Sequence, residues 1–459
     1  MQYIFIILTL LFSFTIISCT ETDESGESNK EIGDASTDTD TDVTSTWTKQ
    51  LGTSDWESAT GIATDSSGNV YVTGRTGSVD IIKGDVGLDG NTSAGGFDLF
   101  VVKYNASGTK QWTKQFGSLK NDYAKGIATD SSGNVYVAGS TGGVMEVRIC
   151  PPKCGLNIFV VKYNSSGTRQ WTRQIGTKDK GGSVTGIATD SLENVYVTGY
   201  AKGNFDTGFG TDSTSYDSAF LVKYDSSGTK RWTKRLAELS QAQAVATDLS
   251  GKVFVTGRTN SNNPKTPTTA IIFLAVFTES LGLDLSGNYY GVLNYTKYIE
   301  TTGLVSAAGF VVDPSGGEMG NFYLTGTTSK GDIFLIQNYG KYGDWTSQDG
   351  TPYSDSANGV ATDSSGNFYV AGRREDKNNL DANNIPITSQ LLIKYNSSGT
   401  KQWTKQYGSL GYDYATGVAT DSSGNVYVTG NTSGGMDGNT NAGGYDIFVV
   451  KYNSDGVKQ

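Results

Sequence analysis

The stretch that decides the fold is GIATDSSGNVYVTG, from Gly61 to Gly74. A short apolar run, a polar turn and an alternating Val-Tyr-Val run follow one another in it, which is the pattern of two strands joined by a tight turn. The turn aspartate, Asp65, can accept backbone N–H groups, while Gly68 and Asn69 tolerate the positive φ that a hairpin needs. The stretch therefore predicts a β-hairpin.

The hairpin returns six more times along the chain. Its turn aspartates recur at intervals of 50 to 65 residues, at Asp130, Asp190, Asp248, Asp313, Asp363 and Asp421. A second hairpin, FVVKYNASGTKQWTKQFG from Phe100 to Gly117, follows the first and recurs from Phe159, Phe220 and Leu391. Each unit thus has four antiparallel strands, here called a to d in chain order, and such units repeated around an axis are propeller blades.

Seven copies predict an all-β fold, a seven-bladed β-propeller of four-stranded antiparallel blades. Blades four and five are divergent, and Tyr295 and Trp345 are expected to take the position of the recurrent tryptophan there. The last module stops at Gln459, where a WTKQ strand is expected, and WTKQ occurs instead at Trp47 to Gln50. We expect residues 45–459 to form one ring closed by the N-terminal strand, because closure removes exposed sheet edges.

These residues resemble the seven-bladed β-propeller repeat family of bacterial exported proteins. Its units read as Gly-x-Ala-x-Asp, then Gly-Asn-x-Tyr-Val-x-Gly, then an Asp-x-Phe-Val-x-Lys-Tyr hairpin. The resemblance extends from Thr46 to Gln459 and is looser in blades four and five. It implies the propeller fold and an exported location, and it implies no particular activity.

The N-terminus also predicts export. The apolar run from Ile4 to Ile17 has 14 residues, which is short for a membrane span and typical of a signal-peptide core. We interpret residues 1–18 as a signal peptide. The sequence Ile16-Ile17-Ser18-Cys19 is similar to a bacterial lipobox, in which Cys19 becomes the lipidated first residue. No Lys or Arg precedes the run, so ordinary secretion with an incidental cysteine is the alternative.

Residues 19–44 consist almost only of Glu, Asp, Ser, Thr and Gly. Such a segment has little to bury and repels itself, so we expect a disordered acidic tether. A lipid at its start would attach the ring to a membrane. The expected location is the bacterial envelope, on the outer membrane or the cell surface.

Composition excludes several classes of function. A net charge of −10 disfavours nucleic acid as a partner, because nucleic-acid affinity depends on Lys and Arg at phosphates. The chain has no histidine, which excludes Ser-His-Asp triads and His-ligated zinc or haem. We therefore expect neither an enzyme nor a cofactor or metal site. Paired carboxylates of a glycosidase or lyase are the catalytic alternative.

Two cysteines remain beyond Cys19. Cys150 and Cys154 lie in a Cys-Pro-Pro-Lys-Cys insert between strands b and c of blade two. A disulfide is the first interpretation in an oxidising compartment. A free dithiol is the second, and a metal pair would need two further ligands.

The aromatic residues that recur once per blade indicate packing between sheets rather than ligand stacking. They are the strand-b residues Tyr71, Tyr136, Tyr196, Phe254, Tyr323, Tyr369 and Tyr427 and the strand-d residues Trp47, Trp112, Trp171, Trp232, Trp345 and Trp403. We interpret the turn aspartates as Asx-turn caps, since a calcium loop would need a distal bidentate acid that is missing here.

The connections between strands predict which face carries function. The a–b and c–d turns are short and nearly identical and must share one face, the uniform face. The b–c and d–a connections are long and differ between blades, and they share the other, the varied face. Since binding residues concentrate on variable loops, we expect function on the varied face. The b–c inserts that differ most span Arg75 to Asp98, Tyr200 to Ala219 and Arg373 to Gln390.

Four acids stand at one offset before strand a of consecutive blades six, seven, one and two. This acidic crescent consists of Glu57, Asp122, Asp355 and Asp413, with Trp56, Tyr123, Tyr412 and Tyr414 beside it. Aromatic faces beside carboxylates suit sugars or cationic side chains. The alternative is that each acid caps the backbone of its own turn. We predict a monomeric, lipid-anchored module that binds a protein or glycan, with a structural envelope component without a ligand as another alternative.

The lipobox generates a first prediction. Replacement of the lipid-accepting thiol, Cys19→Ala, should move the protein from the detergent phase to the aqueous phase of a detergent-partitioning experiment. Cys150→Ala serves as the matched cysteine control and should leave partitioning unchanged. Unchanged partitioning of the Cys19 variant would contradict the anchor.

Overall fold

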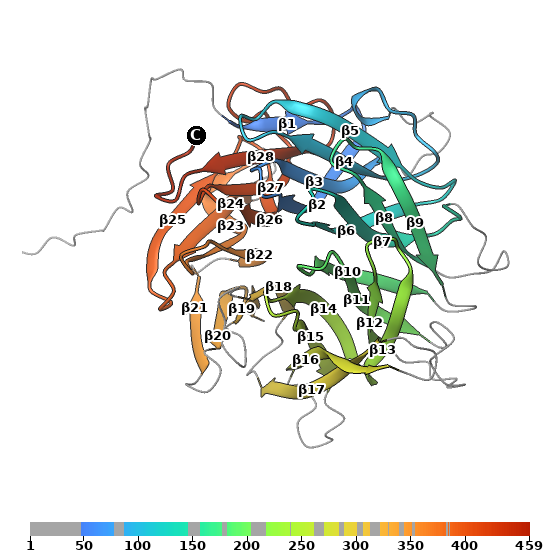
Figure 1. Cartoon of the computed structure of the whole chain (residues 1–459). Helices are drawn as coiled ribbons and strands as arrows, with labels where there is room; N and C mark the ends of the chain where they lie inside the picture. Colours follow the sequence, from blue (N-terminus) through green and yellow to red (C-terminus); the bar gives the residue numbers. More distant parts are fainter. Residues whose placement is uncertain are drawn as a thin grey trace, which may run out of the picture. The chain divides into compact units, whose positions relative to one another are not determined.

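The computed structural model describes residues 47–459 apart from 78–86, 146–156, 177–180, 203–216, 239, 261–269, 284–288, 301–305, 313–321, 329, 339–343, 351–353, 382–383 and 385. Its strands form seven four-stranded antiparallel sheets arranged around one axis (Figure 1). The predicted all-β, seven-bladed propeller is therefore confirmed. The signal peptide, the tether, Cys19, Cys150 and Cys154 lie outside the described residues.

The blades follow one another in chain order. Blade one contains β2 (Trp56–Thr64), β3 (Val70–Gly77), β4 (Asp98–Tyr104) and β5 (Lys110–Phe116), and blade two contains β6 (Asp122–Thr129), β7 (Val135–Thr141), β8 (Asn157–Tyr163) and β9 (Arg169–Ile175). Blade three contains β10 (Gly182–Thr189), β11 (Val195–Lys202), β12 (Asp217–Tyr224) and β13 (Lys230–Glu238). Blade four contains β14 (Ser240–Thr247), β15 (Val253–Asn260), β16 (Ala270–Leu283) and β17 (Tyr289–Glu300).

The remaining blades complete the ring. Blade five contains β18 (Ser306–Val312), β19 (Phe322–Thr327), β20 (Ile333–Asn338) and β21 (Asp344–Asp349). Blade six contains β22 (Asp355–Thr362), β23 (Phe368–Leu380), β24 (Pro386–Tyr395) and β25 (Lys401–Tyr407). Blade seven contains β26 (Asp413–Thr420), β27 (Val426–Thr432) and β28 (Asp446–Tyr452), and its fourth strand is β1 (Lys49–Leu51).

The N-terminal strand closes the ring, as predicted. β1 pairs antiparallel with β28, with Lys49 opposite Val449 and Leu51 opposite Ile447. The backbone N–H of Trp47 donates to the carbonyl of Gln459 over 2.6 Å. The first and the last strand of the propeller, β1 and β28, thus lie side by side in one sheet (Figure 1).

The hairpin that opens each blade forms as predicted. Gly68 has φ +74° in the a–b turn of blade one, a conformation that favours glycine. At the other end of the hairpin, β2 has a bulge between Ala59 and Gly61, opposite Gly74. A Cβ on Gly74 would lie 1.9 Å from the carbonyl oxygen of Ser58, so the close approach of the two strands requires glycine there.

The divergent blades also keep the predicted register. In blade one, Trp112 lies opposite Lys103. Tyr295 lies opposite Val276 in blade four, and Trp345 lies opposite Gln337 in blade five, which are the equivalent positions. The expected assignment of both residues to the tryptophan position is confirmed.

The hydrophobic core lies between blades. One cluster joins Tyr136, Ile158 and Val160 of blade two to Val197 and Phe220 of blade three, and all of these side chains are buried. Strand-d tryptophans connect the outer edges, because their indole N–H groups donate to a c–d turn carbonyl of the next blade. Such bonds join Trp47 to Ala106, Trp112 to Ser165, Trp171 to Ser226 and Trp403 to Ser454, over 3.1–3.3 Å. Packing rather than ligand stacking is confirmed for these tryptophans.

A chain of threonines that the sequence analysis did not single out joins the inner strands. The hydroxyl of Thr129, at the end of β6, donates to the carbonyl of Thr64 over 2.7 Å. The same bond joins Thr64 to Thr420, Thr189 to Thr129, Thr247 to Thr189 and Thr420 to Thr362. Blade five has Val312 at this position, so the chain of hydroxyl bonds is broken there.

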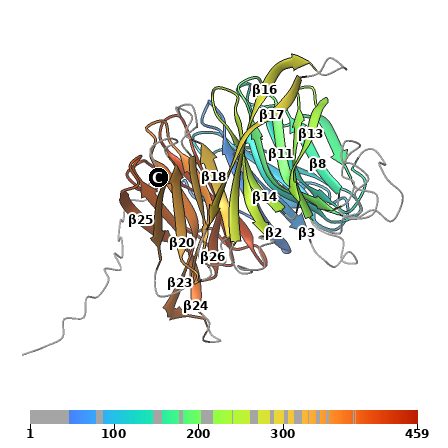
Figure 2. The same cartoon turned by 90° about the horizontal axis from the view of Figure 1, so that it is seen from below.

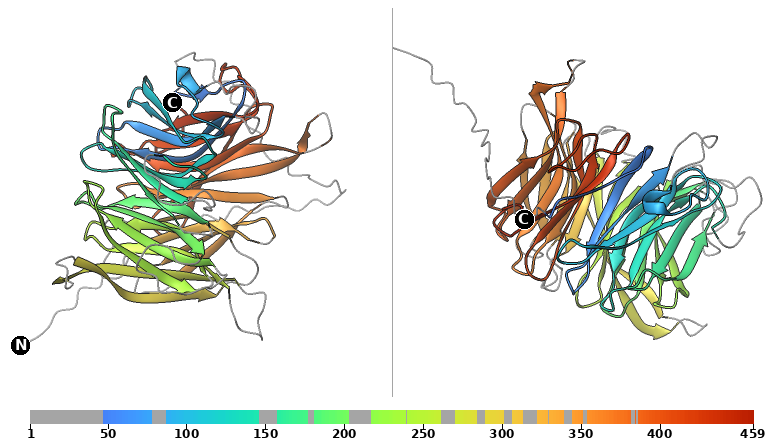
Figure 3. Two further views of the ribbon diagram at one scale, coloured as in Figure 1. Left: turned by 90° about the vertical axis from the view of Figure 1, so that its right-hand side faces the viewer. Right: turned by 90° about the horizontal axis from the view of Figure 1, so that it is seen from above.

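The two faces of the ring are distinguishable in the side views. The β16–β17 hairpin, a c–d pair, projects beyond the ring on one side, and the β23–β24 hairpin, a b–c pair, projects on the other (Figure 2). Both views of Figure 3 show the sheets edge-on, each beside the next. The b–c and c–d connections therefore lie on opposite faces, as the antiparallel order requires.

Ring closure generates a second prediction. Deleting residues 46–52 removes β1, exposes the edge of β28 and uncovers the contacts of Trp47, which is 6% exposed. Loss of a buried tryptophan and of ladder hydrogen bonds should lower the free energy of unfolding by roughly 3–5 kcal/mol. Urea unfolding measures the change, with a deletion of equal length inside residues 20–44 as the control. A melting temperature equal to that of the full chain would contradict closure.

Candidate functional site

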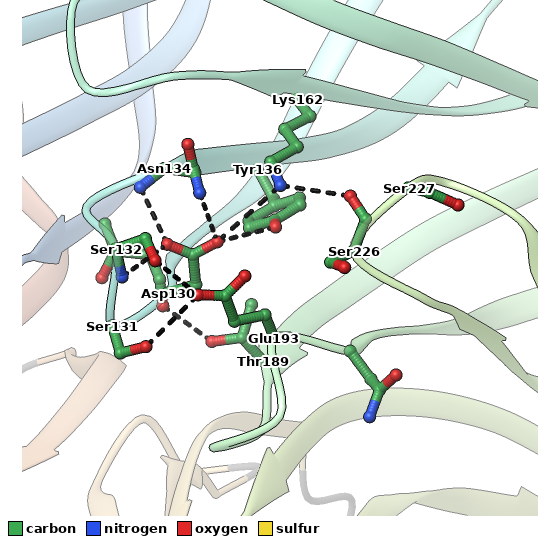
Figure 4. Close-up of polar contacts among 12 residues, drawn as sticks. Asp130, Ser131, Ser132, Asn134, Tyr136, Lys162, Thr189, Glu193, Ser226 and Ser227 are labelled. Carbon is green, nitrogen blue, oxygen red and sulfur yellow. Dashed lines mark hydrogen bonds and ion pairs between the residues drawn. The ribbon is translucent and has the colours of Figure 1, made fainter.

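The turn aspartates of the uniform face are structural. Asp130 Oδ1 accepts the backbone N–H groups of Ser132 and Asn134, over 3.0 and 2.8 Å. Its Oδ2 accepts the Asn134 side-chain amide and the Tyr136 hydroxyl, each over 2.8 Å. Figure 4 shows both oxygens directed into this turn. The predicted Asx-turn cap is confirmed here, and it includes a bond to the buried tyrosine of strand b.

This network continues into the next blade. Lys162 Nζ lies 3.9 Å from Asp130 Oδ2 and 5.0 Å from the centre of the Tyr136 ring, and it donates to the carbonyl of Ser226 over 3.1 Å (Figure 4). The tyrosine hydroxyl also reaches the turn aspartate in blades one, three, six and seven, at Tyr71, Tyr196, Tyr369 and Tyr427. Asp313 lies outside the described residues. The uniform face therefore uses its charged groups to join blades.

The acidic crescent of the varied face is buried. Glu57, Asp122, Asp355 and Asp413 are 1, 0, 0 and 0% exposed. In three of the blades, the acid accepts the backbone N–H of the residue four positions before it. These bonds run from Thr53 to Glu57 over 2.7 Å, from Ser118 to Asp122 over 2.5 Å and from Ser409 to Asp413 over 2.5 Å. Each of these carboxylates thus caps its own d–a loop.

The same three loops share a second tie. The hydroxyl of Ser118 donates to Asp122 and accepts the backbone N–H of Lys120 over 3.1 Å. Thr53 and Ser409 do the same in blades one and seven. A hydroxyl residue four positions before the acid is the sequence signal for this loop, and the sequence analysis did not use it. In blade six, Asp355 instead forms an ion pair with Arg374, over 3.3 Å.

Burial raises the pKa of three crescent acids, Glu57, Asp122 and Asp413. Desolvation raises the pKa of Asp122 from 3.8 to about 6, against the hydrogen bonds from Thr141 and Ser118 that lower it. Burial likewise raises the pKa of Glu57 and of Asp413. A carboxylate with no exposed surface cannot contact a ligand in this conformation. Direct ligand binding by the crescent acids stays a prediction. The contacts described above show that Glu57, Asp122 and Asp413 stabilise their own d–a loops.

Of the four aromatic residues predicted beside the crescent, Trp56 and Tyr414 lie against one common ring, that of Tyr445. Trp56 is 59% exposed, and its ring meets the edge of Tyr445 with centroids 5.4 Å apart. Tyr445 in turn meets Tyr414 at 6.0 Å. Tyr123 lies between blades one and two instead, where its ring centre is 6.1 Å from that of Phe97. Tyr412 donates its hydroxyl to Asp381 over 2.8 Å. We call Trp56, Tyr414 and Tyr445 the aromatic platform.

The platform depends on a loop that occurs twice. The b–c connections of blades one and seven end in DGNTSAGGFD and DGNTNAGGYD. Asp89, in the short helix η2 (Leu88–Gly90), and Asp437 both have positive φ, of 55° and 48°. Each aspartate pairs with the lysine that follows the turn after strand c of its blade, Lys110 or Lys458. The sequence analysis treated these inserts as variable and missed Phe97 and Tyr445, although the repeated motif was readable.

The described part of the chain contains neither a metal-binding cluster nor a membrane-spanning helix. There, no group of three His, Cys, Asp or Glu side chains could hold a metal ion. In the same ranges, no helix has the length and apolarity that crossing a membrane requires.

The buried acids generate a third prediction. Because the folded pKa of Asp122 is raised to about 6 from 3.8, this group binds a proton on folding. Its stabilising contribution is therefore complete below the unfolded pKa and is lost as pH rises through the folded one. Asp122→Asn cannot titrate, and its single amide oxygen cannot replace both carboxylate oxygens, which accept the Ser118 N–H and the Ser118 hydroxyl. Its free energy of unfolding should fall by roughly 1–3 kcal/mol.

Urea unfolding from pH 4 to 7 tests this prediction. The stability difference between wild type and Asp122→Asn should be larger at the acid end, since only the wild type gains stability there. Asp413→Asn should show an independent loss that adds to the first. Asp55→Asn, in the equivalent loop of blade one, is the control. Normal melting of Asp122→Asn with weakened ligand capture would instead favour a direct binding role.

Comparisons with known proteins agree with this architecture. The beta-propeller repeat model matches residues 46–82, 111–144, 170–206, 344–373 and 402–435, which lie in blades one, two, three, six and seven and in the d strands that precede them. The chain is 24% identical over 85% of its length to the WD repeat-containing protein L264 of Acanthamoeba polyphaga mimivirus, of which it covers 36%. It is 27% identical over 42% of its length to the regulatory protein FlaEY of Caulobacter vibrioides, of which it covers 22%.

Among solved structures, the β-propeller domain of the Trilobed protease from Pyrococcus furiosus is similar, with 9% identity and a TM-score of 0.48 over 88% of this chain and 95% of that one. The chain spans little more than a third of the length of the first relative and less of the second. The sheet order and the repeat matches together lead to one conclusion. The chain folds as a seven-bladed β-propeller, and five of its segments match the beta-propeller repeat.

Proposed function

We propose that the propeller is a binding module whose varied face takes a protein or a glycan. The observation that carries this proposal is the aromatic platform, in which Trp56 stays 59% exposed while Tyr445 and Tyr414 support it. An exposed tryptophan held by neighbouring rings loses little side-chain freedom on binding, and tryptophan and tyrosine are typical of binding hot spots.

Two exposed leucines extend this surface. Leu410 of blade seven is 94% exposed and Leu119 of blade two is 82% exposed, and both lie in capped d–a loops. The internal bonds of these loops order the backbone that carries the leucines without a ligand. A surface that is ordered before binding loses less entropy in the complex.

The proposal extends to location and to the class of function. We propose attachment to the envelope through Cys19, with residues 19–44 as the tether. A regulatory protein and a WD repeat-containing protein among the relatives fit an interaction module better than a catalyst. The neighbouring carboxylates Asp98 and Asp122 are each 0% exposed, and a buried pair gives a glycosidase or lyase no access to its substrate.

Matched leucines on the two faces test the proposal. Leu119→Ala with Leu410→Ala changes the varied face, and Leu192→Ala with Leu249→Ala changes a–b turns of the uniform face, where these leucines are 74 and 72% exposed. The immobilised full chain is assayed for capture from envelope extracts and on a glycan array. The varied-face pair, and Trp56→Ala, should weaken capture about tenfold, since burying a leucine is worth about 1.5–3 kcal/mol. Equal loss in both leucine pairs would contradict the proposal.

A further inference from the structure

The varied face carries an unexpected charge beside the aromatic platform. The chain as a whole has a net charge of −10. Yet Arg75 near the end of β3, Lys125 at the bulge of β6 and Arg373 in β23 all lie toward the varied face, in blades one, two and six. Among the described residues, no carboxylate forms an ion pair with any of these three cations.

Arg75 is held by aromatic rings. Its guanidinium lies 4.8 Å from the centre of Phe97 and 5.3 Å from that of Tyr123. Phe97 is buried, so one side of this contact is part of the seam between blades one and two. Contacts of this kind use the face of the guanidinium and leave the N–H groups at its edge able to bind a carboxylate or phosphate.

The charge of Arg75 acts on Lys125, and the charges of Arg75 and Arg373 both act on Tyr414. The charge of Arg75 lowers the pKa of Lys125, after the larger effect of desolvation. Arg75 and Arg373 both lower the pKa of Tyr414, although burial raises it overall. Arg75 is therefore within electrostatic reach of Lys125, and both arginines are within reach of the platform. Arg75 and Lys125 carry like charges and repel each other, and an anion would relieve that repulsion.

The acids of the same region do not cancel this charge. Glu57, Asp122 and Asp413 point into their own loops and are buried, and the raised pKa of Asp122 reduces its charge in mildly acidic solution. These three carboxylates are therefore turned away from a ligand that approaches the varied face.

We infer that the varied face over blades six, seven, one and two binds an acidic glycan, with the carboxylates of uronate-type sugars on Arg75, Lys125 and Arg373 and the sugar rings on Trp56 and Tyr445. The inference rests on the proposed binding function and specifies its ligand. Arginine binds carboxylates through paired hydrogen bonds. The apolar face of a sugar ring matches an exposed, flat tryptophan, whereas an acidic peptide would use the cations and leave the platform unused.

Polygalacturonate is the probe, and its fully methyl-esterified form is the neutral polymer with the same backbone. Binding of both to the full chain is measured by calorimetry at low and high salt. The charged polymer should bind at least about tenfold more tightly than the ester, and salt should weaken it because screening acts on exposed charges. Arg75→Gln and Arg373→Gln should each weaken the charged polymer about threefold to tenfold.

Arg258→Gln is the matched control. Arg258 occupies the position of Arg75 and Arg373 in strand b of blade four, opposite Gln241, with which it forms hydrogen bonds of 2.8 and 3.1 Å. Its replacement should leave binding unchanged. Trp56→Ala should weaken both polymers, since the platform contacts the ring rather than the charge.

The failures of the inference and of the proposed function are distinguishable. Equal binding of charged and esterified polymer, still dependent on Trp56, would overturn the acidic preference and leave the binding module in place. Polyglutamate that binds as tightly as polygalacturonate and ignores Trp56→Ala would indicate an acidic peptide and overturn the glycan. Absence of polygalacturonate binding at low salt would also overturn the inference, while the leucine pairs would still decide the proposed function.

Discussion

The structure depends on one constraint: each four-stranded sheet has two apolar faces, and only the neighbouring blades can cover them. The clusters that join blade two to blade three and blade seven to blade one illustrate this dependence. A row of such sheets would leave an uncovered face at each end, and bending the row into a ring removes both. The short strand β1 stabilises this closure, because its pairing with β28 places the two ends of the ring in one sheet.

The two faces of the closed ring use their polar side chains differently. On the uniform face of blades one, two, three, six and seven, the turn aspartate binds the strand-b tyrosine, and a strand-c lysine such as Lys162 extends this network to the next blade. The varied face is different, because its loops are stabilised internally by buried acids such as Asp122 and can therefore present other residues outward.

This arrangement separates charge within an acidic protein. The crescent carboxylates are desolvated and turned inward, while Arg75, Lys125 and Arg373 stay near the aromatic platform. A protein with an acidic sequence can therefore present a local surface that attracts anions. Net charge describes long-range behaviour, and the nearest unburied groups decide what binds at one place.

The sequence by itself determined the number of blades, the hairpins and the closing strand, because turn chemistry and strand alternation act between residues close along the chain. It also placed Tyr295 and Trp345 in register, since period and spacing suffice for that. Only the tertiary structure decided that the crescent acids face inward and that Arg75 meets Phe97 and Tyr123. Burial and cross-blade contacts depend on which loop of the neighbouring blade covers a side chain, and that is settled only when the ring closes.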